Sequence, residues 1–334
     1  MNGSNRTIIA GTVLALCLGS AAQSLLAATP VYVLTSDSPD LIGELGQTTT
    51  VYEDTISDLA RNFDQGYREM RLANPKVDSW LPGTGTEVLV PSMYIIPKAP
   101  RDGIIINTAE MRIYYFNGKD AGGAKRLMTF PISIGREQWV TPKGRTTVVA
   151  KVKNPVWHPP KSIRKEHAEE GDILPLVVPA GPDNPLGTHA LMLGIEGYLI
   201  HGTDKPFGIG MRVTHGCIRM YPEDIVTMFN ATPVGTPVHI VNQPLKVGIA
   251  SGNIYLEVHP HLEEELGAAS GELYSTAVKL ILERVKGYNA ALVWSDIKSA
   301  LQSPTGVPRA VGTVQAKSSS EASTALSGRH VARN

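Results

Sequence analysis

Short β-rich runs separated by glycine and proline fill residues 101–243, and they constrain the fold more than any other feature of the chain. The runs are rich in Ile, Val, Tyr, Phe and Thr, which favour strands. They lie at 103–107, 111–116, 127–135, 146–152, 190–193, 199–201 and 238–241. With 24 Pro and 32 Gly, the chain favours many turns over a helical bundle. We therefore predict a mainly β fold, with a sandwich or barrel-like sheet over 101–243.

Three local signals complete this region. Asn117-Gly118, between two runs, predicts a hairpin turn. Residues 222–229, which directly follow the segment around Cys217, predict a short helix. Residues 154–185 are dense in proline and lack regular periodicity. A segment this long is either a binding loop or lid, or a plain surface excursion, and the sequence leaves both open.

Residues 48–92 predict a small separate unit. Apolar residues at helical spacing over 54–63, and a second helical run over 67–73, lie between strands at 49–52 and 86–91. The order strand, helix, helix, strand, with the phrases DTISDLARNF and LANPKVDSWLPGTGTEVLVP, resembles a LysM module. This resemblance implies binding to N-acetylglucosamine-containing glycans. A spacer without a ligand is the alternative.

The C-terminal third returns to helical periodicity. Apolar residues recur on one helical face over 273–285 and again over 292–301. We therefore predict a helical extension over 244–303, packed on the sheet. Ser, Ala, Thr, Gly and Lys dominate residues 304–334, which predicts a disordered tail.

The N-terminus predicts export. Arg6, an apolar run over 7–18 and small residues after it match a secretory signal over 1–28, cleaved near Ala28. The run is too short to span a membrane, and no later stretch is apolar enough to do so. Leu16 before Cys17 departs from the small residue that a lipidation box requires. We expect a soluble periplasmic protein, and the equal counts of 31 basic and 31 acidic residues argue against nucleic acid.

Cys217 is the only cysteine that remains beyond this signal. An exported chain with one thiol cannot form an internal disulfide, which leaves a bridge to another chain, an inert buried thiol or a reactive one. His215 lies two residues before it, His201 sixteen before it and Arg219 two after it. Because imidazoles and cations help to generate a thiolate, this pattern favours a reactive nucleophile.

The residues around Cys217 carry a family resemblance. They are His201-Gly202-Thr203, Gly208-Ile209-Gly210 and Thr214-His215-Gly216-Cys217-Ile218-Arg219-Met220, preceded by Pro182-Asp183-Asn184-Pro185-Leu186-Gly187. The pattern resembles the L,D-transpeptidases, whose YkuD-like catalytic domain acts on the bacterial cell wall. With the LysM-like module and the C-terminal extension, the chain resembles the periplasmic subgroup that attaches an outer-membrane lipoprotein to peptidoglycan.

The resemblance implies a reaction. Cys217 would attack the diaminopimelate carbonyl of a tetrapeptide stem and release D-alanine, and an amine would then take the acyl group from the thioester. By resemblance, His201 is the proton donor and acceptor, with the Gly202 carbonyl fixing its tautomer. His215 would support the site, since residues two apart in extended backbone point the same way; a purely structural His215 is the alternative. Carbapenems are expected inhibitors, and no cofactor is expected.

The residues beside the thiol suggest further parts. The N–H groups of Gly216 and Cys217 would stabilise an oxyanion, because a residue without a side chain allows close approach. Arg219 would bind a stem-peptide carboxylate bidentately, or else form an ion pair with Glu223 or Asp224. We also expect Thr214 and Gly202 to contact the substrate.

Three other functions compete. His201, His215 and Cys217 could bind zinc, although the sequence lacks the Glu spacing of zinc peptidases, so no metal is predicted. A non-catalytic wall-binding protein would be expected to have lost the nucleophile or the base. Water could take the acyl group, giving a carboxypeptidase or a lipoprotein-detaching amidase, and a second diaminopimelate could take it, giving a direct cross-link. The sequence does not separate these acceptors from a lipoprotein lysine.

Overall fold

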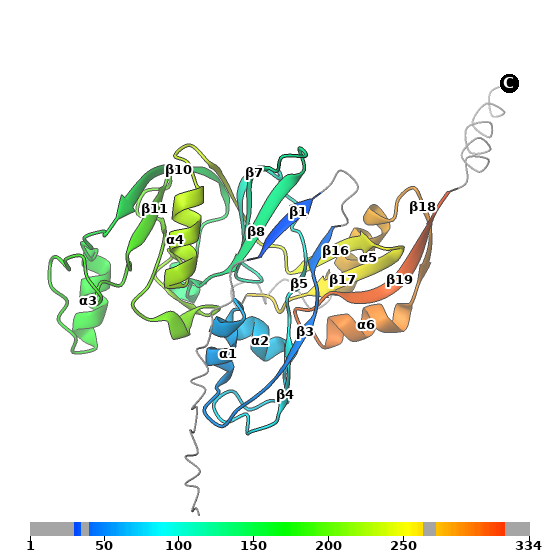
Figure 1. The fold of residues 1–334 in the computed structure, drawn as a ribbon, viewed down its shortest axis with the longest axis horizontal. Coiled ribbons are helices and arrows are strands. Elements are labelled where there is room, and N and C mark those ends of the chain that lie inside the picture. Colours follow the sequence, from blue (N-terminus) through cyan, green and yellow to red (C-terminus); the bar gives the residue numbers. More distant parts are fainter. Residues whose placement is uncertain (1–29, 35–39, 263–271, 318–334) are drawn as a thin grey trace, which may run out of the picture.

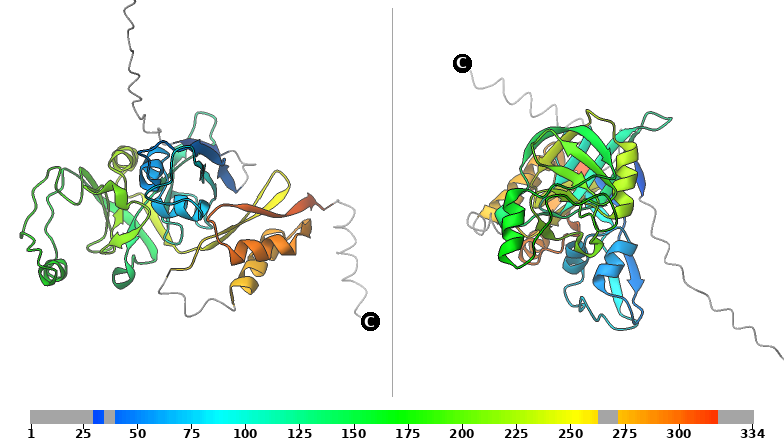
Figure 2. Two further views of the ribbon diagram at one scale, coloured as in Figure 1. Left: turned by 90° about the horizontal axis from the view of Figure 1, so that it is seen from below. Right: turned by 90° about the vertical axis from the view of Figure 1, so that its left-hand side faces the viewer.

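A nine-stranded sheet dominates the structure, a computed structural model that describes residues 30–34, 40–262 and 272–317 (Figure 1). The strand order is β1-β8-β7-β6-β15-β10-β11-β12-β14. The bounds are β1 (Val31–Leu34), β6 (Gly103–Asn107), β7 (Arg112–Lys119), β8 (Lys125–Pro131), β10 (Gly144–Lys153), β11 (His189–Leu193), β12 (Leu199–His201), β14 (Ile218–Arg219) and β15 (Pro237–Val241). The sheet curls, as Figure 2 shows, and the predicted mainly β fold is confirmed.

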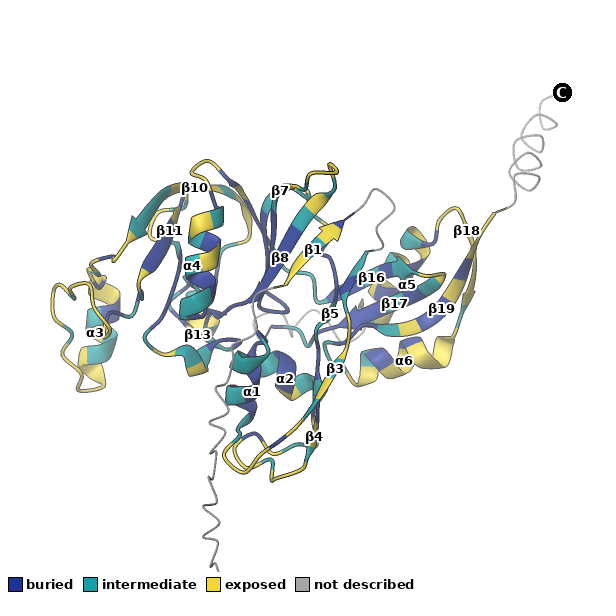
Figure 3. Cartoon of the chain, viewed as in Figure 1, coloured by how far each residue is buried: buried dark blue, intermediate teal, exposed yellow. Residues whose placement is uncertain are grey.

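Both faces of the sheet are buried around β6. Ile104 and Ile106 pack into the main core, which the helix α4 (Pro222–Ala231) covers. Ile105 points the other way, into a second core with Tyr114 and residues from the N-terminal strands. Burial on both sides explains why this strand reads as a continuous apolar run (Figure 3).

The N-terminal unit has the predicted element order. It consists of β3 (Gly46–Thr49), α1 (Ile56–Asn62), α2 (Tyr67–Ala73) and β4 (Glu87–Val90), and the pair β2 (Leu41–Gly43) with β5 (Met93–Ile95) joins it to the rest. A capping box starts α1: the Asp58 N–H donates to Thr55 Oγ1 and the Thr55 N–H to Asp58 Oδ2, both at 3.1 Å. The identification as a LysM module stays a prediction.

The C-terminal region needs correction. The expected helices are α5 (Glu272–Arg284) and α6 (Trp294–Gln302), but they pack on a four-stranded sheet of order β16-β17-β19-β18. Its strands are β16 (Leu245–Ala250), β17 (Asn253–Val258), β18 (Tyr288–Leu292) and β19 (Arg309–Ala316). The prediction of disorder from 304 is therefore wrong as far as 316, because β19 pairs on both sides and buries Val311. The rest of the predicted tail, 318–334, lies outside the described residues, as does the predicted signal.

Two predictions within 101–243 also change. β7 continues through Asn117-Gly118 with a register shift, and the turn lies at 120–124, where the Ala124 N–H donates to Asp120 Oδ1 at 2.8 Å. Residues 154–185 are not wholly irregular, because they contain the helix α3 (Lys161–Glu169). The remaining short elements are β9 (Ile134–Gly135), β13 (Arg212–Thr214) and the 3₁₀ turns η1 (Glu137–Trp139) and η2 (Pro206–Gly208).

Buried ion pairs join the units. Arg112 of β7 donates to both carboxylate oxygens of Glu69 on α2, at 2.7 and 2.8 Å. At the other junction, the Nζ of Lys246 on β16 lies 2.6 Å from Glu110 and 2.7 Å from Glu257. A buried charge that loses its partner is strongly destabilising, so these contacts fix how the units sit together. No helix among residues 30–34, 40–262 and 272–317 has the length and apolar character to cross a membrane.

We predict that Glu69→Gln lowers the free energy of unfolding by about 3–5 kcal/mol, because the buried Arg112 charge loses the carboxylate of its ion pair. Arg61→Ala is the matched control. Arg61 crosses the same junction to Glu223 at 3.0 Å, but both side chains are about one-third exposed (29% and 32%). The control should cost about 0–1 kcal/mol. Urea unfolding measures both; equal losses would contradict the importance of the buried pair.

Candidate active site

The parallel pairing of β12 with β14 assembles the site. Ile200 lies opposite Ile218, and His201 lies opposite Arg219. Residues in register share one face of a sheet, and both isoleucines are fully buried in the core. His201 and Arg219 therefore lie on the other face. Cys217 immediately precedes β14, next to Leu199, with which its sulfur forms a backbone hydrogen bond.

The loop that carries Cys217 is held by hydroxyl groups. Thr214 Oγ1 donates to the Cys217 carbonyl at 2.6 Å and accepts from the Gly216 N–H at 3.2 Å. Thr141 Oγ1 donates to the Gly216 carbonyl at 2.8 Å. Gly216 has φ +101°, and a Cβ there would lie 2.9 Å from the Tyr198 ring. Only glycine fits this position, because both the conformation and the space exclude a side chain.

These bonds bear on two sequence predictions. The Gly216 N–H donates to Thr214 Oγ1 at 3.2 Å, so the loop already uses this donor. Thr214 is buried, and its hydroxyl shapes the loop and does not face a substrate. The Cys217 N–H has no acceptor among the described residues and is the remaining candidate donor from the predicted pair.

The Cys217 thiol is half-buried and lies 3.5 Å from the Gly197 carbonyl. Burial raises the pKa of this thiol above its ordinary value, although the Leu199 backbone and the Arg219 charge oppose the rise. This shift favours the neutral thiol over the thiolate near pH 7. The neutral thiol needs a base at the moment of attack.

His201 is a buried neutral imidazole. Its Nδ1–H donates to the Gly202 carbonyl at 2.7 Å, as predicted, which leaves Nε2 as a proton acceptor. Burial, and next the Arg219 charge, lower the pKa of His201 to about 3. Gly202 is itself buried, and its N–H donates to the His189 carbonyl at 3.1 Å. Gly202 thus orients the imidazole, and the structure does not support the predicted substrate contact.

His215 belongs to a separate cluster. Its Nε2 lies 3.1 Å from Glu166 Oε2 and 2.9 Å from Arg136 Nη2, and its ring meets Trp139 edge-on at 5.2 Å. Arg136 and Glu166 also form an ion pair. The positive φ of Gly216 breaks the extended backbone on which the predicted alignment with Cys217 rested. His215 therefore connects the thiol loop to α3, which carries Glu166.

Arg219 has no ion-pair partner among the described residues. The two carboxylates predicted as alternatives lie elsewhere: Glu223 pairs with Arg61, and Asp224 is buried close to Asp64, whose charge raises its pKa. Arg219 Nε is buried without a hydrogen-bond partner. Its positive charge lowers the pKa of Cys217 and that of His201. A guanidinium in this state can accept a ligand carboxylate.

The alternative zinc site is not assembled. Within the described parts of the chain, one group of His, Cys, Asp and Glu side chains brings three ligand atoms within 4.8 Å of one another, and it consists of Glu110, Glu257 and His259. Lys246 Nζ already lies between these two carboxylates. The three residues considered from sequence do not meet this criterion.

Sequence reasoning missed four residues that shape the site. They are Arg136, Trp139, Thr141 and Glu166, which contact the loop that carries Cys217. The first three follow β9 at a turn without a recognised motif. Glu166 lies in the segment that was expected to be irregular. A lid over the site was one of the two alternatives for that segment, and the contact with His215 favours it.

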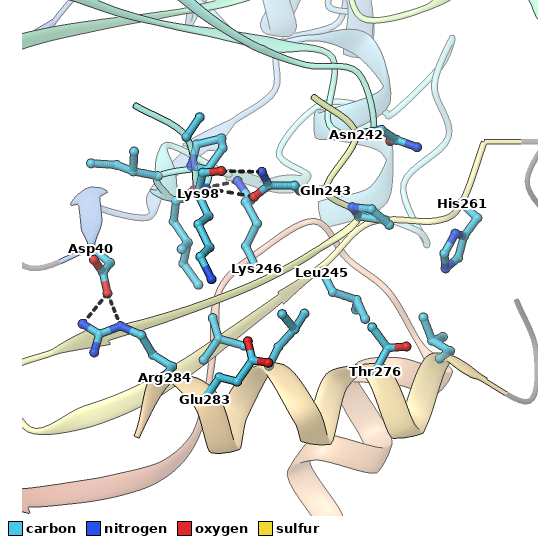
Figure 4. Close-up of a pocket in the computed structure, with 18 of the residues that line it drawn as sticks. Asp40, Lys98, Asn242, Gln243, Leu245, Lys246, His261, Thr276, Glu283 and Arg284 are labelled. Carbon is cyan, nitrogen blue, oxygen red and sulfur yellow. Dashed lines mark hydrogen bonds and ion pairs between the residues drawn. The ribbon is translucent and has the colours of Figure 1, made fainter. Parts of the chain in front are cut away.

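A pocket of about 950 Å³ lies away from the thiol. It lies between α5 and the segments 95–101 and 242–247 (Figure 4). At its edge, Arg284 Nη2 forms an ion pair with Asp40 Oδ2 at 2.6 Å. The Gln243 side chain hydrogen-bonds to the backbone N–H and carbonyl of Lys98. None of the residues that line it belongs to the thiol loop. It is a junction between units.

A thiol directly before β14, with a buried imidazole and an unpaired guanidinium in register on β12 and β14, is the pattern of a cysteine-dependent enzyme. The profile of the L,D-transpeptidase catalytic domain, YkuD, matches residues 101–240. The chain belongs to the L,D-transpeptidase family.

Curated relatives extend this similarity over most of the chain. The chain is 40% identical to probable L,D-transpeptidase ErfK/SrfK of Salmonella typhimurium, over 69% of this chain and 74% of that protein. It is 41% identical to probable L,D-transpeptidase YbiS of Escherichia coli K12, over 70% and 76%. Among solved structures, the catalytic domain of the E. faecium L,D-transpeptidase has a TM-score of 0.32 at 20% identity, over 43% of this chain and 99% of that one.

We predict that alkylation of Cys217 by iodoacetamide accelerates with pH beyond pH 9, without a plateau near neutrality. The raised pKa means that the reactive thiolate increases about tenfold per pH unit throughout this range. The Arg219 charge holds the pKa of Cys217 down. In Arg219→Ala this pKa should therefore rise, and the curve of alkylation rate against pH should move to higher pH. Peptide mass mapping measures the rate at Cys217. A plateau between pH 5 and 8 would instead indicate a preformed thiolate–imidazolium pair.

Proposed function

We propose that this enzyme transfers acyl groups between peptidoglycan stem peptides and an amine, with Cys217 as nucleophile and His201 as base. Transfer of the thiol proton to His201 Nε2 accompanies attack of Sγ on the carbonyl of the diaminopimelate L-centre in a tetrapeptide stem. The new C–S bond forms as the amide bond to D-alanine breaks, and His201 returns its proton to the leaving amine. The observation that supports the proposal is the parallel pairing of β12 with β14, which sets His201 opposite Arg219, two residues after Cys217.

Arg219 and the Cys217 N–H support this step. The unpaired guanidinium would bind a carboxylate of the stem peptide or of its D-alanine, and would stabilise the thiolate as it forms. The Cys217 N–H would donate to the oxyanion. His215, held by Glu166 and Arg136, would keep the loop in place and act through it, not on the reacting atoms.

For the second half of the reaction we propose the C-terminal lysine of an outer-membrane lipoprotein as the acceptor. The relatives match this chain well beyond the catalytic domain, which agrees with the resemblance to the lipoprotein-attaching subgroup. A second diaminopimelate or water would use the same thioester. Export through residues 1–28 to the periplasm, and glycan binding by the N-terminal unit, belong to the same proposal and would place the enzyme beside its donor.

Incubation with a tetrapeptide muropeptide tests this function. We expect D-alanine release and a thioester on Cys217, both absent from a folded Cys217→Ala variant, and a carbapenem should add one drug mass to the same residue. Three arms distinguish the acceptors by product mass: a peptide ending in lysine, a second stem peptide, and buffer alone. Transfer by Cys217→Ala would refute the nucleophile. Preference for the second stem, or hydrolysis alone, would refute the lipoprotein assignment only.

A further inference from the structure

Thr141 is a buried residue that connects β9 to the loop that carries Cys217. Its Oγ1 lies 3.1 Å from the backbone nitrogen of Gly135, at the end of β9, and 2.8 Å from the carbonyl oxygen of Gly216. A threonine hydroxyl has a single hydrogen to donate. Because the Gly135 N–H can only donate and the Gly216 carbonyl can only accept, the hydroxyl hydrogen points to Gly216.

Threonine hydroxyls hold three successive peptide units of this loop. Thr214 holds the outer two, because its Oγ1 accepts from the Gly216 N–H and donates to the Cys217 carbonyl. The middle unit joins Gly216 to Cys217, and its carbonyl is the one that Thr141 binds. Within the described parts of the chain, the hydrogen bond from Thr141 is the one that this middle unit makes.

This hydrogen bond sets the direction of the Cys217 N–H. In a trans peptide unit the C=O and the N–H point in opposite directions, and the described parts of the chain contain no cis peptide bond. With its carbonyl held by Thr141, the middle unit directs the Cys217 N–H away from Thr141. This N–H has no acceptor among the described residues, and it belongs to the residue that carries the thiol.

Gly216 makes such a restraint necessary. Its φ is +101°, and a residue without a side chain gives the peptide unit that follows it more freedom to rotate. Rotation of the middle unit would turn the Cys217 N–H away from a carbonyl held at the thiol. A hydrogen bond to the C=O also polarises the peptide unit, which makes its N–H a stronger donor. Thr141 thus determines both the direction and the strength of this donor.

Attack of sulfur on a carbonyl group places a negative charge on the carbonyl oxygen, and donors already directed at that oxygen stabilise it. We infer that Thr141 is a positioning residue for this step. It orients the peptide unit between Gly216 and Cys217 so that the Cys217 N–H faces the oxyanion, and it does not itself contact the substrate. This inference rests on the proposed function, in which the Cys217 N–H is that donor. Sequence analysis missed the role because Thr141 lies 75 residues before Gly216.

Two kinds of reaction at Cys217 separate this role from a general effect on the loop. Acylation by a tetrapeptide stem, or by p-nitrophenyl acetate, forms an oxyanion before the amine or nitrophenolate leaves. Alkylation by iodoacetamide does not, because the sulfur displaces iodide from a saturated carbon. Intact-protein mass spectrometry measures each rate at one pH, with Cys217→Ala as the blank.

We expect Thr141→Val, which keeps the shape of the side chain but lacks the hydroxyl, to slow acylation by both reagents about 10–100-fold. Complete loss of an oxyanion donor costs about 10²–10³-fold, and a misdirected donor should cost less. Alkylation should keep its wild-type rate. Thr141→Ser retains the hydroxyl and should restore most of the acylation rate.

Thr236→Val is the matched control. Thr236 is also buried, and its hydroxyl also donates to a backbone carbonyl, that of Pro233 at 2.7 Å, outside the thiol loop. This variant should leave both acylation and alkylation unchanged. Thr141→Ala, which removes the hydroxyl without placing a methyl group in its position, repeats the test if the valine variant does not fold.

The outcomes distinguish this inference from the proposed function. Acylation at the wild-type rate by a folded variant without the hydroxyl would overturn the role of Thr141, as would an equal loss of acylation and alkylation. The proposed function would stand in either case. If the stem peptide does not acylate the wild-type enzyme, but acylation by the ester depends on Thr141 as expected, the proposed function fails and the positioning role stands.

Discussion

The active site depends on one backbone contact, the parallel pairing of β12 with β14. It places His201 opposite Arg219, two residues after Cys217, on one side of a sheet whose other side is core. The two central side chains of this pairing, Ile200 and Ile218, are fully buried, so apolar packing maintains the register. A shift by one residue would turn His201 into the core and separate base from nucleophile.

The electrostatics of the site favour neutral partners. Burial raises the pKa of Cys217 and lowers that of His201 to about 3, and both shifts favour the neutral forms of the two groups. The proton must therefore move as the carbonyl is attacked, when the developing charges have the substrate and Arg219 to stabilise them. A neutral thiol is also a weaker target for oxidation than an exposed thiolate. This arrangement suits a nucleophile that works outside the reducing interior of the cell, where we expect this enzyme.

The sequence predicted those features that depend on residues close together in the chain. The strands over 101–241 follow from β-branched runs, and the hydrogen bond from His201 to the Gly202 carbonyl follows from adjacency. Long-range contacts were not predictable. The strand β19 lies in a stretch rich in Ala, Gly and Thr, a composition that reads as disordered until two partner strands cover it. Glu166 reaches His215 because α3 folds back over the loop, across a separation of 49 residues, and Arg136 reaches it across 79 residues because β9 pairs with β13.

Single-turnover acylation of Cys217 by a tetrapeptide stem, followed by intact-protein mass spectrometry, tests the central claim most directly. Comparison of His201→Gln with His215→Gln separates the base from the histidine that supports the loop. If His201 accepts the thiol proton, its replacement should slow acylation by roughly 10²–10⁴-fold, and the His215 variant should lose much less. Acylation by the folded His201→Gln protein at the wild-type rate would contradict the assignment of the base and, with it, the role given to the β12–β14 pairing.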